Sequence, residues 1–409
     1  MNAAARILPL LRRGEHVFLP GSAAEVTSLS EALARDDAPA IDILSTMVPG
    51  INPGLRKAGD PGGAITNAFA SGPRGAQSAG TVRHLPLSYA GFLRHVCQST
   101  FDTTVVQVAP PLSGTLASFG LAVEFTPVAV ARSRRVIAVV NPNMPWIPGA
   151  EVFDLAAASV VVESDEPLRE YDVGTPAPMA RSIAVHIASH IGDGAAIQVG
   201  LGKVPDALLR LLTDRRKLRL QSGMLSDGAW LLTDAGALDD GFLHTSCVHV
   251  GTHRYYEWLR DRTDFGIRGC DHTHDAGMLG TVKGLVAINS ALSIDLFGQA
   301  NLEMLDGRAI SGVGGAADFA RAAAVSATGI SIVALPSTSG DGSVSRIVPQ
   351  LGGIVSLPRH DIDVVVTEFG AADLRKASVI ERGHRLIAIA DPRHQPELDA
   401  AWREIARKL

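Results

Sequence analysis

Two glycine-rich turns in this chain have residue types that can bind anions and oxyanions. The first, residues 197–206, runs from a buried apolar stretch into Gly200-x-Gly202 and then into a helix near Pro205. Glycines let a ligand approach the main chain, and the helix N-terminus that follows favours anions through its free N–H groups. The alternative is a tight turn that binds nothing, because a lone G-x-G pattern is weak evidence.

The second turn, residues 309–319, places Gly312, Gly314 and Gly315 just before a helix that we expect to begin near Asp318. Successive N–H groups in such a loop can form a concave nest that stabilises an oxyanion. Asp318 has a simpler reading as a helix cap.

Two further polar segments offer donors to a ligand. Asn289 follows an apolar stretch that reads as a buried strand, so its amide could donate to a carbonyl oxygen or satisfy its own backbone in a turn. Residues 335–348 combine several hydroxyls with Arg346. They suit contact with a phosphate or diphosphate, or form a solvated surface loop.

A third group of residues has the side chains that zinc accepts. It consists of Cys247, His249, His253, Cys270, His272 and His274. The spacing is not a standard zinc-finger pattern, so we predict a histidine-rich loop and no metal site.

The elements that would position these residues alternate between short apolar runs and helical stretches. Continuous hydrophobicity in the runs predicts strands buried on both faces, as in a parallel sheet covered by helices. Strands are expected at 16–19, 104–108, 136–140, 195–199, 285–288, 330–335, 362–366 and 386–389, and helices at 29–34, 206–212, 318–325 and 397–405.

A cluster of prolines, glycine and charges at residues 168–178 predicts a domain boundary. We therefore expect an α/β protein of two tandem α/β/α domains with mostly parallel sheets, comprising residues 1–175 and 176–409.

Composition excludes several classes of protein. A net charge of −5 argues against nucleic acid as the main partner, and no stretch reaches the roughly 18 apolar residues of a membrane span. Three cysteines cannot form a disulfide framework, which favours a reducing compartment. We expect a cytoplasmic protein.

Taken together and in this order, the polar segments resemble the acetyl-CoA hydrolase / 4-hydroxybutyrate CoA-transferase family, which has the class I CoA-transferase fold. The resemblance covers nearly the whole chain and is most specific from residue 197 onward. It also includes Val106–Pro111, Val139–Pro145, Ser226–Gly228 and Val366–Leu374.

The resemblance implies two facing α/β domains with acyl-CoA in the cleft between them. It implies an acyl-CoA and a small carboxylic acid as substrates, a role in acetate metabolism and a homo-oligomer, commonly a homodimer. It assigns the coenzyme A contacts to Gly200, Leu201, Gly202, Lys203 and Val204, with Arg346 added from its loop. It assigns the oxyanion and thioester contacts to Asn289, Gly312, Gly314 and Gly315.

One position departs from the family pattern. The family's nucleophilic glutamate stands just before Met-x-Ser-Asp-Gly, and here that position is Gly223. No acyl-glutamyl anhydride can form on a glycine. Glu124 and Glu368 are carboxylates from elsewhere in the chain, and neighbouring Ser222 should point to the opposite face of its strand.

We therefore expect a protein that acts on an acyl-CoA thioester, by CoA transfer or hydrolysis, without the usual glutamyl-CoA intermediate. One alternative is a non-catalytic acyl-CoA-binding protein or subunit. Another, less favoured, is a sugar-phosphate isomerase-like enzyme of the same general fold class.

Overall fold

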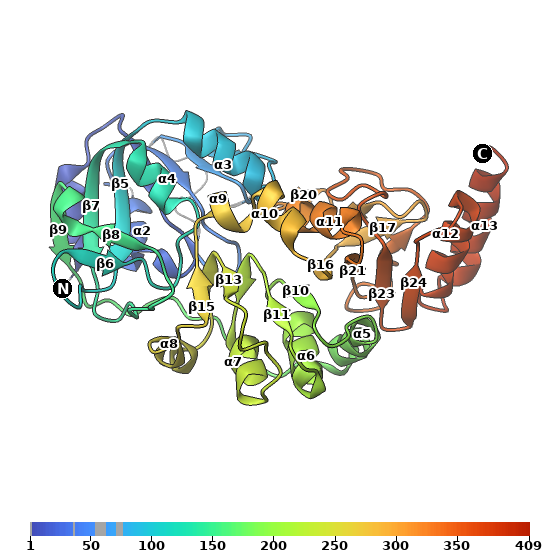
Figure 1. The fold of residues 1–409 in the computed structure, drawn as a ribbon. Coiled ribbons are helices and arrows are strands. Elements are labelled where there is room, and N and C mark those ends of the chain that lie inside the picture. Colours follow the sequence, from blue (N-terminus) through green and yellow to red (C-terminus); the bar gives the residue numbers. More distant parts are fainter. Residues whose placement is uncertain (1, 36, 54–62, 71–76) are drawn as a thin grey trace.

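A computed structural model describes residues 2–35, 37–53, 63–70 and 77–409, and it contains two large, mostly parallel sheets (Figure 1). The first sheet is parallel throughout, with the order β4-β3-β2-β1-β5-β7-β9. Its strands are β1 (His16–Leu19), β2 (Asp42–Ser45), β3 (Ile65–Asn67), β4 (Val82–His84), β5 (Phe101–Val108), β7 (Ser133–Val140) and β9 (Val160–Glu163).

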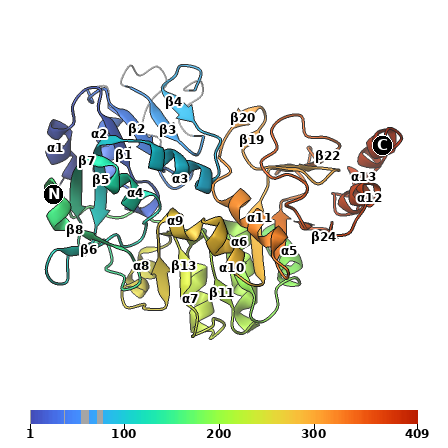
Figure 2. The ribbon, with the colours of Figure 1, turned by 45° about the horizontal axis from the view of Figure 1, so that its top comes forward.

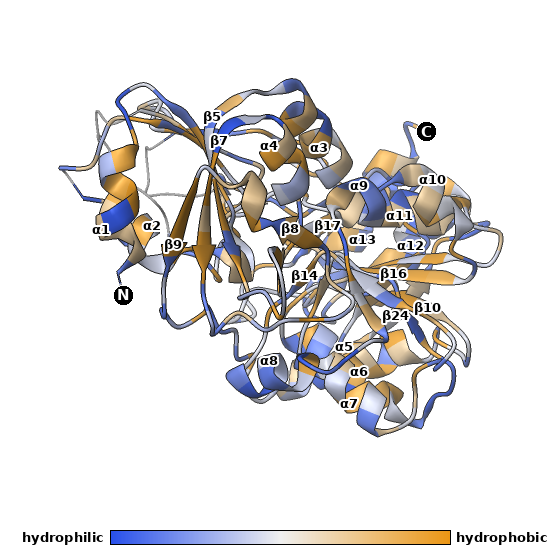
Figure 3. Ribbon diagram, turned by 60° about the vertical axis from the view of Figure 1, so that its left-hand side comes forward, coloured by the Kyte–Doolittle hydropathy of each residue, from blue (hydrophilic) through white to orange (hydrophobic). Residues whose placement is uncertain are grey.

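Helices cover both faces of this sheet. They are α1 (Ala3–Ile7), α2 (Thr27–Leu33), α3 (Tyr89–Gln98) and α4 (Thr126–Ala131). Figure 3 shows α1 and α2 on one side of β5 and β7, and α3 and α4 on the other. Successive side chains of a strand point to opposite faces, so Val17 and Leu19 enter one apolar core while Phe18 enters the other.

The second sheet has the order β11-β10-β16-β21-β23-β24 and is parallel except for its last strand. Its strands are β10 (Ala196–Gln198), β11 (Arg219–Leu220), β16 (Leu285–Ser290), β21 (Ile330–Ala334), β23 (Val364–Thr367) and β24 (Gly370–Asp373). The central strands β16, β21 and β23 are almost fully buried, as their unbroken apolar sequences predict.

Helices also cover both faces of the second sheet. The helices of this half of the chain are α5 (Pro178–Ala188), α6 (Lys203–Leu211), α7 (Asp227–Asp234), α8 (His253–Leu259), α9 (Cys270–Thr273), α10 (Ala276–Thr281), α11 (Ala316–Val325), α12 (Val379–Ala388) and α13 (Gln395–Ala406). In Figure 1, α10 and α11 lie above the strands, while α5 and α6 lie below them.

Short elements complete the chain. The remaining strands are β6 (Leu116–Ser118), β8 (Val152–Asp154), β12 (Met224–Leu225), β13 (His244–Ser246), β14 (Val248–His249), β15 (Phe265–Ile267), β17 (Ser293–Asp295), β18 (Ala300–Asn301), β19 (Met304–Leu305), β20 (Arg308–Ala309) and β22 (Ile347–Val348). Single bridges from Ala122 to Val248 and from Glu124 to Gly269 join the first half of the chain to the second.

The predicted α/β class with mostly parallel sheets is confirmed, and one predicted strand is wrong. Residues 386–389 end helix α12, which begins with a capping box between Ser378 and Glu381. Its buried Leu386 and Ile387 belong to the same apolar core as Trp402 of α13. The boundary proposed at residues 175/176 lies between β9 and α5 and stays a prediction. None of the described helices is long and apolar enough to span a bilayer.

Candidate active site

A cavity of about 350 Å³ lies between the two sheets and draws its walls from both halves of the chain. Phe69 and Tyr89 line it from the first half. Tyr171 lines it from the linker, residues 164–177 between β9 and α5, and residues at the ends of β10 and β16 line it from the second half. Figure 2 shows α3, α9 and α11 meeting in this region. Ligands of open α/β sheets commonly bind where strands end and loops begin, as here.

The first glycine turn forms one wall of this cavity. Gly200 and Leu201 line it. Gly202, with a φ of +124°, is the residue before α6, and Lys203 and Val204 begin that helix. Lys203 is exposed to solvent. The turn therefore offers main chain to the cavity, and an exposed cation follows it at the start of α6.

The second glycine turn forms another part of the wall. Gly314 and Gly315 line the cavity, and Gly314 has a φ of +54°. Gly312 does not line it, because its Cα packs against the main chain of Ala68, where any Cβ would collide with the carbonyl oxygen.

Hydrogen bonds fix this second turn to the first half of the chain. Tyr89 N donates to Gly314 O (2.9 Å), and Ala70 N donates to Ser311 O (3.2 Å). Asp318, in the first turn of α11, accepts from Ser88 Oγ (2.8 Å). Asp318 therefore links α11 to the start of α3, and as an acidic residue it also stabilises the first turn of α11.

Asn289, near the end of β16, lines the cavity and carries an unpaired donor. Its Nδ2 is buried and makes no hydrogen bond to any described residue. Buried amide groups are rarely left unpaired, and such exceptions are found at catalytic and ligand-binding positions. This amide is therefore available to a carbonyl oxygen in the cavity.

Gly223 lines the cavity beside His274, a neighbour that the sequence did not indicate. A Cβ on Gly223 would lie 3.2 Å from His274 Nε2 and 3.8 Å from Phe319. A Cβ on Gly315 would collide with the same Nε2. The imidazole ring therefore occupies the space that a side chain at 223 would enter.

A threonine is the hydrogen-bond partner of His274. Thr273 Oγ1 lies 2.9 Å from His274 Nδ1 and 3.2 Å from Gly269 O. When the hydroxyl donates to Gly269 O, Nδ1 carries the ring proton and Nε2 is an acceptor; when it donates to Nδ1, Nε2 carries the proton. Burial lowers the pKa of His274 to about 3, so the ring is neutral at pH 7.

Behind Tyr89 lies a buried carboxylate. Glu124, in the left-handed region at a φ of +45°, accepts from Thr46 Oγ1 (2.9 Å) and Tyr89 OH (3.4 Å). Burial raises its pKa to about 7. Burial, together with the Glu124 charge, also raises the pKa of Tyr89. Glu124 does not itself line the cavity.

No described residue that lines the cavity carries a carboxylate, ammonium or guanidinium group. Glu368 instead accepts two hydrogen bonds from Ser337. Arg346 donates to the carbonyl oxygens of Thr338 and Leu292 and so stabilises its own loop. Ser222 donates to Val199 O (2.7 Å). The side-chain groups left to act on a ligand are hydroxyls, amides and one imidazole.

The cysteine- and histidine-rich stretch divides into two sets. His253 and His272 are exposed, and His249 is buried with its Nδ1 2.5 Å from Tyr255 OH. Cys247, Cys270 and His274 come together beneath Gly223.

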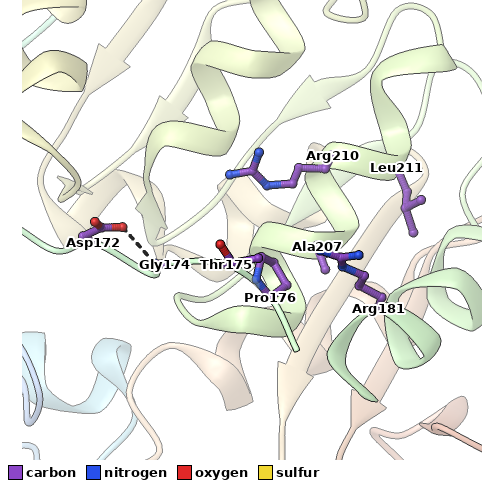
Figure 4. Close-up of a pocket in the computed structure, with 8 residues that line it drawn as sticks. All are labelled: Asp172, Gly174, Thr175, Pro176, Arg181, Ala207, Arg210 and Leu211. Atoms are coloured by element: carbon purple, nitrogen blue, oxygen red, sulfur yellow. Dashed lines mark hydrogen bonds between the residues drawn. The ribbon is translucent and has the colours of Figure 1, made fainter. Parts of the chain in front are cut away.

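A second cavity, of about 520 Å³, lies along the linker (Figure 4). It is lined by Asp172, Gly174, Thr175, Pro176, Arg181, Ala207, Arg210 and Leu211. In Figure 4 the Arg210 side chain extends from α6, and that of Arg181 rises from α5 beside Ala207. Arg210 pairs with Asp206 (2.8 Å), whereas Arg181 makes no ion pair with a described residue. Tyr171 lines the first cavity and Asp172 the second, so the linker borders both.

Comparison with known proteins identifies the family. Residues 68–169 match the acetyl-CoA hydrolase/transferase N-terminal domain, and residues 251–402 match the acetyl-CoA hydrolase/transferase C-terminal domain. The 4-hydroxybutyrate coenzyme A transferase of Clostridium kluyveri is 35% identical over 305 residues, which are 73% of this chain and 71% of that protein.

Solved structures agree over nearly the full length. RipA from Yersinia pestis superposes with a TM-score of 0.88 at 28% identity, covering 99% of this chain and 97% of that one. The 4-hydroxybutyrate CoA-transferase of Porphyromonas gingivalis gives a TM-score of 0.80 at 27% identity, covering 100% and 97%. This chain therefore belongs to the acetyl-CoA hydrolase/transferase family.

Proposed function

We propose that this protein cleaves an acyl-CoA thioester with water, without a glutamyl intermediate. The observation that carries the proposal is the buried, unpaired Nδ2 of Asn289 in the wall of a cavity that contains no carboxylate among its described lining residues. A donor fixed in a dry site stabilises the oxyanion that forms when a nucleophile adds to a thioester carbonyl. Because no described lining residue offers a carboxylate to attack, we take water as the nucleophile.

The residues have defined roles in this reaction. The thioester oxygen accepts from Asn289 Nδ2 and from the main chain of the Gly314–Gly315 turn. Water lies on the cavity side of Gly223 and donates to His274 Nε2. Its oxygen adds to the carbonyl carbon, the C–S bond breaks, and the displaced sulfur takes up the proton. The products are a carboxylic acid and free coenzyme A.

The charged end of coenzyme A needs cations, and none of the described residues that line the cavity carries one. Lys203 at the start of α6 is the nearest along the first glycine turn. The linker then leads to the second cavity, where Arg181 is unpaired and Arg210 is held by Asp206. We place the phosphates along this route, because guanidinium groups match phosphate geometry.

A second candidate, a non-catalytic acyl-CoA-binding protein, is supported by the same lack of a carboxylate among the described lining residues. It predicts saturable binding of acyl-CoA without turnover.

The test measures free thiol release from a panel of acyl-CoAs, with and without carboxylic acids, and acyl-CoA binding by calorimetry. Water-dependent thiol release that is lost in Asn289→Ala supports hydrolysis. Binding without release supports the second candidate. Calorimetry that detects no coenzyme A ester binding would refute both, and turnover of sugar phosphates in its place would favour an isomerase.

A further inference from the structure

Three buried side chains with metal-binding groups meet beneath the floor of the first cavity. They are Cys247, between β13 and β14, Cys270, the first residue of α9, and His274, which follows α9. Their ligand atoms all lie within 4.8 Å of one another. Both cysteines are free thiols. Cys270 and His274 are 23 and 27 residues after Cys247 in sequence, so the fold brings them to it.

Main-chain contacts hold the three residues in place. Cys270 and His274 are four residues apart around a helical turn, which puts their side chains on one face, and His274 N donates to Cys270 O (3.1 Å). Cys270 N donates to Glu124 O (2.8 Å), and Cys247 donates both its N–H (3.1 Å) and its Sγ–H (3.0 Å) to Gly223 O. The three side chains are therefore held through the main chain of Glu124, Gly223 and Cys270.

Two thiols and an imidazole are the donor set of a zinc site. Zinc accepts Cys and His in tetrahedral geometry, and a site with three protein ligands keeps a fourth position open for water. Zinc–sulfur bonds of about 2.3 Å imply ligand atoms roughly 3.5–4 Å apart. The ligand atoms here need only a small inward movement to reach that geometry.

We propose that Cys247, Cys270 and His274 bind one Zn²⁺ ion whose open position faces the cavity at Gly223. The location supports this placement. Cys247 Sγ contacts the Gly223 carbonyl, and the imidazole of His274 lines the cavity 3.2 Å from where a Cβ at 223 would stand. The glycine leaves that approach unobstructed.

This inference goes beyond the proposed hydrolysis and, for its catalytic part, rests on it. With the ion bound, the His274 nitrogen that would otherwise accept from water is a metal ligand, and the ion takes over the activation of the water. A zinc ion turns bound water into a good nucleophile at neutral pH. The proton released by that water goes to the departing CoA sulfur, so the reaction consumes one water and needs no oxidant or second substrate.

The experiment measures metal on the intact protein. Wild type is purified in zinc-supplied medium and its metal content is measured. It is then stripped with a chelator and titrated with Co²⁺, whose thiolate complexes give a charge-transfer band in the near ultraviolet. Cys247→Ser and Cys270→Ser are compared with Cys97→Ser, which alters an exposed free cysteine elsewhere. We expect about one ion per chain and a strong band in wild type and Cys97→Ser, with both lost in the two buried variants.

The Co²⁺ spectrum of wild type tests the site even if a buried variant fails to fold. Absence of the band in stripped wild type overturns the proposal. So does a mass decrease of two hydrogens without reductant, because the two thiols would then form a disulfide.

A parallel assay separates this inference from the hydrolysis itself. Thiol release that survives chelation overturns the catalytic role of the ion and leaves the proposed hydrolysis standing. A charge-transfer band without thiol release from any acyl-CoA supports the metal site and refutes the hydrolysis.

Discussion

Restoring a glutamate at position 223 should strain the fold, because His274 occupies the space. A Cβ there would lie 3.2 Å from His274 Nε2 and 3.4 Å from Cε1, with Phe319 at 3.8 Å behind it. His274 is only 2% exposed, so its ring cannot swing into solvent. Overpacking of this kind typically costs about 1–3 kcal/mol. We expect Gly223→Glu to lower the free energy of unfolding by that amount.

Removing the imidazole should relieve the strain. His274→Ala alone should cost about 2–4 kcal/mol, because it leaves a cavity. In the double variant the glutamate fills part of that cavity, so the total loss should be about 1–3 kcal/mol less than the sum of the two single losses. The double variant also regains a carboxylate in the cavity, so it should exchange CoA between an acyl-CoA and a carboxylic acid.

Urea denaturation of the four proteins measures the coupling. Gly200→Ala is the matched control, since a Cβ there meets nothing within 4 Å, and it should change stability by less than about 0.5 kcal/mol. If the loss of stability in the double variant equals the sum of the two single losses within about 0.5 kcal/mol, His274 does not occupy the space of the glutamate.

Three further outcomes follow from the site and its surroundings. Asn289→Ala should lower kcat for thiol release about 100-fold with KM little changed, and a loss of stability with kcat intact would contradict this role. Arg181→Glu should raise KM for acyl-CoA about tenfold or more at constant kcat, whereas the exposed control Arg94→Glu should not; equal effects would rule out the phosphate route. Burial lowers the pKa of His244 to about 4. Below about pH 6.5 this histidine is therefore protonated in the unfolded chain but stays neutral in the native state, so the free energy of unfolding falls as the pH drops. His244→Asn keeps an acceptor for Leu220 N and should remove about 2.5 kcal/mol of that loss between about pH 7 and pH 4.5; identical pH dependence of unfolding in both proteins would refute it.

The sequence predicted those parts of the fold that depend on local pattern. Unbroken apolar runs predicted strands such as β10, β16 and β21, and the glycines at 200 and 314 predicted turns that do line one cavity. The strand predicted at 386–389 was wrong because a buried strand and the apolar stripe of an amphipathic helix have the same pattern over four residues.

The rest of the site depends on distant contacts. His274 is 51 positions after Gly223 in the chain, and no periodicity links them. The sequence offered six cysteines and histidines without indicating which three would meet. It also placed Gly312 and Arg346 on a ligand, although Gly312 packs against Ala68 and Arg346 holds its own loop. Such assignments need the tertiary structure, because they depend on which way each side chain faces.

The turn at Gly314 belongs to one half of the chain by sequence and to the other by hydrogen bonding. Its bonds from Ala70 and Tyr89, and those of Asp318 to Ser88 Oγ and Ala90 N, all cross between the halves. At about 1 kcal/mol each, these four bonds make separation of the halves costly. Because the same bonds hold the turn in place, separation of the halves would also disorder the turn. The amide hydrogens of Ala70 and Tyr89 should therefore exchange with deuterium together, at a rate set by this one opening.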